Sequence, residues 1–275
     1  MASLFLTTIC LVVGAVAGFL GGLLGIGGGV IIVPALIFAF DHGGISAAQS
    51  GGGAAITLIA VGTSLGSIVF TSAAAARAQI RAGMVEWTIV RRFVVTLILG
   101  SYAAGFVAAM LPQALLRGVI GVFLGFVSVV MLTNWRPAPH RVLPGPAGTA
   151  GIAAFAGLLS GIAGIGGGNV VVPTLVYYNV PVHRATATAS TLGFPIAIAG
   201  SLGYISRGFT DMSLANGLLG YIYLPALLAI VCTTVLFAPL GVRVAHRLSP
   251  APLKRVFGAL LILVAVRMCW TAFAA

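Results

Sequence analysis

The chain is short of charged residues. Asp, Glu, Lys and Arg make up only 6% of its 275 residues, against roughly 25% in a typical soluble domain. Apolar residues make up 60%. So few charges exclude a water-facing surface around a globular core, whereas a surface that faces lipid requires apolar side chains and paired backbone groups. The sequence therefore predicts an all-α integral membrane protein that crosses the cell (inner) membrane several times.

Acidic residues are the scarcest charged type. Asp41, Glu86 and Asp211 stand against 14 Lys and Arg, which gives a net charge of +11. In a soluble protein this excess would suggest nucleic acid, but no Arg-rich tail or patch with interleaved aromatic residues supports that partner. Arginine-rich cytoplasmic loops of a membrane protein explain the excess better. We expect the lipid bilayer, and no nucleic acid, as a partner.

Cysteine and catalytic groups are also scarce. Cys10, Cys232 and Cys269 all lie in apolar runs and form no CxxC pair, so we interpret them as small apolar side chains rather than as disulfides or metal ligands. The sequence contains no HExxH, no phosphate-binding loop of the Walker type and no paired acids. We therefore expect no metal site, no cofactor, no catalytic residues and no enzyme activity.

One 19-residue segment occurs twice. Residues 18–36 and 157–175 are identical at eleven positions and share the pattern GIGGG-x4-VP. This duplication predicts two membrane repeats, 1–133 and 147–275. Between them, residues 134–146 contain four prolines, which is typical of a loop outside the hydrocarbon, and we expect this linker to be cytoplasmic.

Ten apolar runs predict about 8–10 membrane segments. Two of the runs, 29–40 and 169–180, follow the glycine triplets and have 12 residues each. A helix of that length spans about 18 Å, against about 30 Å of hydrocarbon. We expect Gly-broken or re-entrant helices there. The other runs are 4–24, 45–76, 93–111, 118–133, 147–165, 186–205, 213–241 and 253–273.

The arginines predict the orientation of the two repeats. Loop 77–92 holds four of them, and loop 242–255, which is not its counterpart in the other half, holds three together with a lysine. If each glycine-rich segment turns back, 11 of the 14 basic residues fall on one side, as the positive-inside rule favours. If each is a single broken crossing, the split is about even. The charges thus predict inverted-topology repeats, an architecture common in secondary transporters, with both termini opposite the cytoplasm.

The paired glycine triplets are the first candidate for a substrate site. A short helix that begins at a glycine turn presents unpaired N–H groups and the positive end of its dipole, which favours an anion. The alternative is that these glycines only allow close helix packing. The candidate substrate-binding residues are Gly27, Gly28, Gly29, Gly166, Gly167 and Gly168.

Hydroxyl and amide side chains could complete that site. Thr63 and Ser64 lie in AVGTSL, Ser190 and Thr191 lie in the comparable ATASTL, and Asn169 follows the second triplet directly. Such groups can ligate an oxyanion, although Ser and Thr in helices more often bond back to a carbonyl.

Ionisable groups at loop edges are candidates for coupling. Asp41 and His183 could carry a proton or act in gating, and His42, Glu86 and Asp211 widen that list. The alternative is that all of them are solvated residues at the membrane interface.

Several of these segments together resemble the sulfite exporter TauE/SafE family of membrane permeases. They are the doubled GIGGG-x4-VP, AVGTSL at 60–65, Gly83 and Glu86-Trp87 after a basic loop, and LKRVFGALLILVAVRM at 253–268. The resemblance covers nearly the whole chain. It implies transport of small sulfur-containing anions such as sulfite, thiosulfate or organosulfonates, in either direction. The chain departs from the pattern in an insertion at 41–59.

We therefore expect a secondary transporter for a small, sulfur-containing anion. The alternative is a channel or carrier for another small solute, such as a carboxylate or a metal ion. A metal ion is disfavoured because thiolates, histidines and acids are scarce within the apolar runs. The sequence leaves open which anion is moved, in which direction, with which coupling ion, and whether the protein is a homo-oligomer.

Overall fold

The computed structural model describes residues 2–24, 28–44, 55–133, 143–211, 217–245 and 250–273. Eight helices in this part of the chain have 18 residues or more: α1 (Ala2–Leu24), α3 (Ile56–Arg81), α4 (Trp87–Met110), α5 (Gln113–Thr133), α6 (Pro146–Ala163), α8 (Val182–Asp211), α9 (Leu224–Ala245) and α10 (Pro250–Phe273). Six of them, α3, α4, α5, α6, α8 and α9, are long and apolar enough to cross a membrane. The predicted all-α, multi-pass membrane fold is confirmed.

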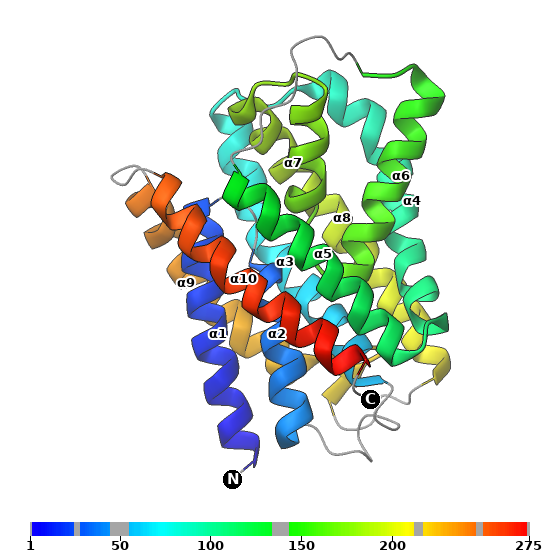
Figure 1. The fold of residues 1–275 in the computed structure, drawn as a ribbon, viewed down its shortest axis with the longest axis vertical. Coiled ribbons are helices and arrows are strands. Elements are labelled where there is room, and N and C mark those ends of the chain that lie inside the picture. The colour runs from blue at the N-terminus through cyan, green and yellow to red at the C-terminus, as the bar shows by residue number, and fades with distance from the viewer. Residues whose placement is uncertain are drawn as a thin grey trace.

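Two short helices follow the glycine triplets, as the sequence predicts. They are α2 (Gly29–Ala39) with 11 residues and α7 (Gly168–Tyr177) with 10, so at 1.5 Å per residue each is about 15 Å long. In Figure 1, α2 runs back beside α1 and ends near the N-terminus, while α7 runs back toward the end where α6 begins. A single π-helical turn, η1 (Phe40–Gly44), extends α2.

The predicted apolar run 213–241 is not one continuous helix. Strands β1 (Leu218–Leu219) and β2 (Ile222–Tyr223) form a short antiparallel hairpin before α9 begins. Gly217 and Gly220 have φ of 81° and 59°, a left-handed conformation that glycine adopts without steric cost. The hairpin turns the chain inward, and Tyr221 and Ile222 are buried.

Glycines let two helix pairs approach closely. A methyl group at Gly18 of α1 would lie 2.7 Å from the Thr234 carbonyl oxygen of α9, and one at Gly157 of α6 would overlap the Leu97 carbonyl of α4. The contacts advance in the same direction along both helices of each pair, so α1 is parallel to α9 and α4 is parallel to α6. Such small-residue contacts are typical of membrane helix interfaces.

Two further pairs are antiparallel. In α3 and α8, Ser72 lies beside Gly193 while Leu65 lies beside Gly200. In α5 and α10, the Ser128 hydroxyl donates to the Gly258 carbonyl at 2.5 Å, and Gly118 lies near Ala272 at the other end. The helices of the two halves can be matched in order, α1 with α6 through to α5 with α10. Exchanging matched helices then turns the α1–α9 pair into the α6–α4 pair. It leaves the α3–α8 pair and the α5–α10 pair unchanged.

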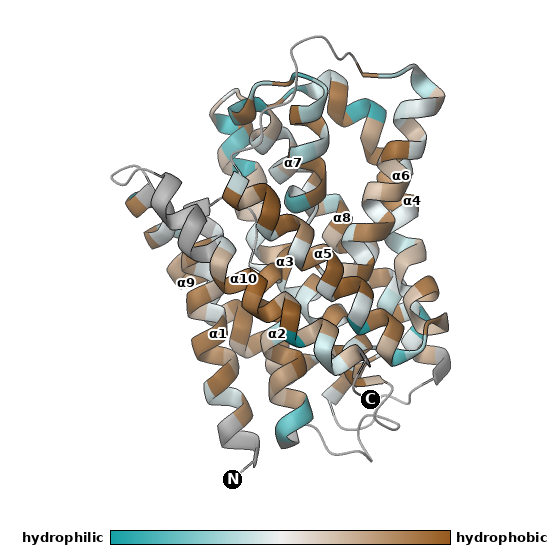
Figure 2. Ribbon diagram, viewed as in Figure 1, coloured by the Kyte–Doolittle hydropathy of each residue, from teal (hydrophilic) through white to brown (hydrophobic). Residues whose placement is uncertain are grey.

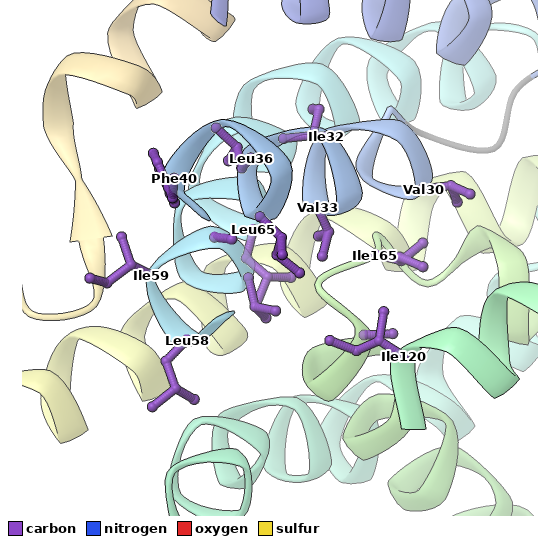
Figure 3. Packing of buried hydrophobic residues seen from close by; sticks show 14 of the residues in the cluster. Val30, Ile32, Val33, Leu36, Phe40, Leu58, Ile59, Leu65, Ile120 and Ile165 are labelled. Atoms are coloured by element: carbon purple, nitrogen blue, oxygen red, sulfur yellow. The ribbon is translucent and has the colours of Figure 1, made fainter. Parts of the chain in front are cut away.

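Apolar residues cover most of the helix surfaces, and hydrophilic ones gather toward the two ends (Figure 2). α1 begins and α10 ends in the lower part of Figure 1, whereas α3 ends and α4, α6 and α8 begin at the upper end. A core between the halves packs α2 and α3 against Ile120 of α5 and Ile165 (Figure 3). The division at 134–146 lies largely outside the described residues and stays a prediction.

Candidate functional site

The second glycine triplet connects the end of α6 to the start of α7. Gly164 ends α6 in the left-handed conformation, with φ of 67°, and the Ile165 N–H donates to the Ser160 carbonyl at 3.0 Å, as in a Schellman-type helix end. α7 then begins after Gly167, and no side chain caps it. The residues from Gly164 to Gly168 are buried.

The first triplet leads into α2 in a similar way. Gly28 precedes α2, and no side chain caps this helix either. The first N–H groups of a helix lack the usual partner within it. Three of them bond locally here, from Ile31 to the Gly28 carbonyl, from Gly168 to the Gly166 carbonyl and from Val170 to the Gly167 carbonyl. Both helices begin in the protein interior. Gly27 lies outside the described residues.

The two glycine segments meet, although 139 residues separate their positions in the sequence. A methyl group at Gly29 would lie 2.7 Å from the Gly164 carbonyl oxygen and 3.1 Å from the Ile165 Cα. The Ser64 hydroxyl of α3 donates to the same Gly164 carbonyl at 2.9 Å. The starts of two short helices from the two halves therefore converge on one buried region.

Two isoleucines cover these helix starts. A methyl group at Gly29 would lie 2.6 Å from the Ile68 Cδ1, and one at Gly166 would lie 2.7 Å from the Ile68 Cγ2. At Gly167 an added methyl group would overlap the Ile196 Cδ1. Ile68 lies on α3, Ile196 lies on α8, and both are buried. In this conformation the two side chains pack directly against the glycines at the helix starts.

The predicted hydroxyls have distinct roles in the structure. The Thr63 hydroxyl accepts a hydrogen bond from the Tyr223 N–H at 2.9 Å, and Ser64 donates to Gly164. Only Thr191 shows the alternative expected from the sequence, because its hydroxyl donates back to the Ala187 carbonyl of its own helix at 3.0 Å. Ser190 is half-buried on α8.

Asn169 is buried in the first turn of α7, next to the converging helix starts. A further polar group there, Ser160, was not predicted. It is fully buried, and its hydroxyl has no hydrogen-bond partner among the described residues. The duplicated segment could have indicated Ser160, because this serine replaces the Gly21 of the first copy. In the same way, Asn169 replaces the Val30 of the first copy.

The predicted coupling residues lie away from this region. Asp41 is exposed, and its carboxylate pairs with Arg117 of α5 at 2.7 Å. His183 is exposed in the first turn of α8, where the neighbouring Arg184 pairs with Glu86. Their role in coupling stays a prediction. The Arg267 guanidinium packs over the Phe38 ring, 4.5 Å from its centroid.

Comparison with known proteins identifies similar chains along nearly the full length. The family model "Sulfite exporter TauE/SafE" matches residues 10–268. A probable membrane transporter protein of Haemophilus influenzae is 31% identical over 263 residues, covering 94% of this chain and 97% of that protein. One of Methanocaldococcus jannaschii is 28% identical, covering 94% and 93%. One of Xylella fastidiosa is 26% identical, covering 95% and 94%. No solved structure matches the chain.

Proposed function

The chain belongs to the sulfite exporter TauE/SafE family and is a membrane transporter, and we propose that its cargo is a small sulfur-containing anion carried by secondary transport. The observation that carries this proposal is the convergence of two uncapped helix starts, at Gly29 and Gly168, on one buried region. Helix starts favour anions through their N–H groups and dipoles. They supply this attraction without an arginine in the hydrocarbon, which would be costly.

Neutral donors suit a transporter because the substrate must leave as well as enter. A small oxyanion gives up its hydration shell on entry and requires several donors in return. The N–H group of Gly29, the buried Asn169 side chain and the Ser160 hydroxyl lie at or next to the helix starts, and the Ser160 hydroxyl has no hydrogen-bond partner among the described residues. Ser64 contributes indirectly, because its hydroxyl bonds to the Gly164 carbonyl and so holds the turn at the end of α6 in place.

The proposal includes two repeats of inverted topology. Two observations support it. First, α3–α8 and α5–α10 are each antiparallel pairs of matching helices, which a two-fold axis across the helices requires. Second, the N–H group just before α4, of Glu86, donates to Thr188 of α8 at 3.0 Å, and the N–H group just before α9, of Tyr223, donates to Thr63 of α3 at 2.9 Å. Inverted repeats that rock about a central site give alternating access.

The substrate is tested with the purified protein in sealed vesicles. Uptake of labelled sulfite, thiosulfate, a taurine-like sulfonate and sulfate is measured beside a carboxylate and a divalent metal ion. We expect gradient-driven uptake of at least one sulfur anion, with little uptake of the other two solute classes. Preferential uptake of the carboxylate or of the metal would overturn the sulfur-anion assignment, and turnover of the solute without vesicles would indicate an enzyme.

The site itself is tested by a compensated pair of substitutions. Gly167→Ala places a methyl group on the Ile196 Cδ1, so loss of transport in this variant alone could reflect poor packing. Ile196→Val removes the Cδ1, and the double variant therefore has room for the added methyl group. If the triplet binds the substrate, the double variant folds but still transports at least tenfold less than Ile196→Val. Recovery of transport in the double variant would show that the triplet serves packing alone.

Asn169→Ala provides the complementary test. Loss of one hydrogen bond to a charged ligand costs about 1.5–3 kcal/mol, so we expect the KM for the transported anion to rise at least tenfold while the amount of folded protein stays near wild type. An unchanged KM would remove Asn169 from the site.

A further inference from the structure

Arg117 lies at the far end of α2 from the glycine site and makes two side-chain contacts. Its Nη2 pairs with the Asp41 carboxylate at 2.7 Å, and its Nε donates to the Thr57 hydroxyl at 3.1 Å. The Arg117 side chain is only 12% exposed, and Thr57 is fully buried. A guanidinium withdrawn this far from water requires an anionic partner, because an unpaired buried charge is costly.

The surroundings of Arg117 are also positive. Thr57 is the second residue of α3, so Arg117 lies beside the N-terminal end of that helix and its partial positive charge. A second guanidinium, that of Arg267, packs on Phe38 in the last turn of α2. In the part of the chain that the structure describes, Asp41 is the carboxylate paired with Arg117. Arg117 and the positive end of α3 therefore attract anions from the adjoining solution.

We propose that Arg117 and Thr57 form a second binding site for a small oxyanion, and that Asp41 occupies this site in the present conformation. A carboxylate offers the guanidinium the same pair of oxygens that an oxyanion offers. The two partners differ in freedom: the Asp41 side chain is 31% exposed and lies on the single π-helical turn η1, a feature frequent at functional sites. Asp41 can therefore leave for water, whereas Arg117 stays held by Thr57.

Exchange of Asp41 for an anion would affect the glycine site through α2. Asp41 follows the last residue of α2 by two positions, and the first residue of α2, Gly29, touches Gly164. While the ion pair is formed, it ties the end of α2 to α5. An anion on Arg117 releases this tie and leaves α2 held only by its packing. The inference rests on the proposed function only for the identity of the anion.

The test measures thiosulfate binding to the purified full chain in detergent by calorimetry, which gives both affinity and number of sites. Asp41→Asn removes the competing carboxylate, and we expect a site about tenfold tighter than in the wild type, equivalent to about 1.4 kcal/mol. The double variant Asp41→Asn with Arg117→Gln should lose that site. Glu86→Gln is the matched control, because it breaks the ion pair with Arg184 at the other end of the molecule and should leave thiosulfate binding unchanged.

A thiosulfate affinity in Asp41→Asn within twofold of the wild type, or a tight site that survives Arg117→Gln, would overturn the proposal. If Arg117→Gln does not fold, Arg117→Lys replaces it, since an ammonium keeps the charge but loses the planar fork, and the tight site should weaken. The outcomes separate the two proposals. An unchanged Asp41→Asn in a protein that transports thiosulfate refutes only this site, whereas a tightened site in a protein that transports no sulfur anion refutes only the proposed function.

Discussion

Gly29 is the residue on which the contact between the two halves depends most directly. An alanine there would place its methyl group 2.7 Å from the Gly164 carbonyl oxygen and 2.6 Å from the Ile68 Cδ1. Ile68 can change rotamer, but Gly164 is backbone at the end of α6, held by the Ser64 hydroxyl. The first and second glycine segments therefore have to separate to admit even one methyl group.

We expect Gly29→Ala to lower the midpoint of thermal unfolding in detergent and to abolish transport. Gly151→Ala is the matched control, because Gly151 also lies within a helix but no atom lies within 4 Å of its added methyl group. In the control, alanine should be neutral or should stabilise the protein by about 0.5–1 kcal/mol, since glycine loses more backbone entropy in a helix. Equal behaviour of the two variants would refute the close contact at Gly29.

The starts of α4 and α9 are held by similar hydrogen bonds. Each runs from the N–H group just before the helix, to Thr188 of α8 for α4 and to Thr63 of α3 for α9. Replacing Thr63 or Thr188 by valine keeps the shape of the side chain and removes the acceptor. Each change should lower stability by about 1 kcal/mol, the usual net worth of such a bond. Thr186→Val is the control, because Thr186 is half-buried and its hydroxyl bonds back to its own helix, to the Val182 carbonyl. Thermal unfolding of the three variants checks this, and a loss in only one of Thr63 and Thr188 would argue against equivalent halves.

The helices could be predicted from the sequence because lipid allows only long apolar segments with internally paired backbone. The short lengths of α2 and α7 could also be predicted, because the apolar run after each glycine triplet has only 12 residues. The hairpin at 218–223 could not be predicted, since it lies inside the apolar run 213–241 and two glycines, Gly217 and Gly220, mark the turn. The side chains that cover the triplets, those of Ile68 and Ile196, could not be predicted either. Their positions depend on how α3 and α8 pack against each other, which the sequence does not show. The Arg117–Asp41 pair joins residues 76 positions apart, and no periodicity indicates such a partner.

The whole molecule has two ends, and the orientation of these ends in the membrane can be measured. In a background without Cys10, Cys232 and Cys269, single cysteines replace Arg81, Arg243 and Ala114, all of which are exposed. The positive-inside rule predicts that an impermeant thiol reagent added outside cells labels Ala114→Cys but neither Arg81→Cys nor Arg243→Cys. Permeabilised cells, in which all three should react, provide the control. Labelling of only one of the two arginine positions from outside would refute the inverted arrangement.

Coupling to an ion gradient is also a property of the whole molecule, because the coupling group has to be exposed to both sides in turn. Glu86 is paired with Arg184, and His183 lies exposed beside that pair, at the end where α4 and α8 begin. Asp41 is paired with Arg117, which also bonds to Thr57 at the start of α3. Each of these groups is placed at one end of the molecule, away from the buried meeting point of Gly29 and Gly164, where an alternating site would lie.

We therefore expect Glu86→Gln and His183→Gln to retain accumulation of the transported anion in vesicles under an imposed pH gradient, within about twofold of the wild type. Exchange of labelled for unlabelled anion, measured without a gradient, reports the carrier step alone and serves as the control. If both variants keep accumulation and exchange, the proton travels on the anion itself or another ion drives transport. If one variant keeps exchange but loses accumulation, that residue carries the proton, and the end of the molecule at which it lies must reach the central site during each cycle.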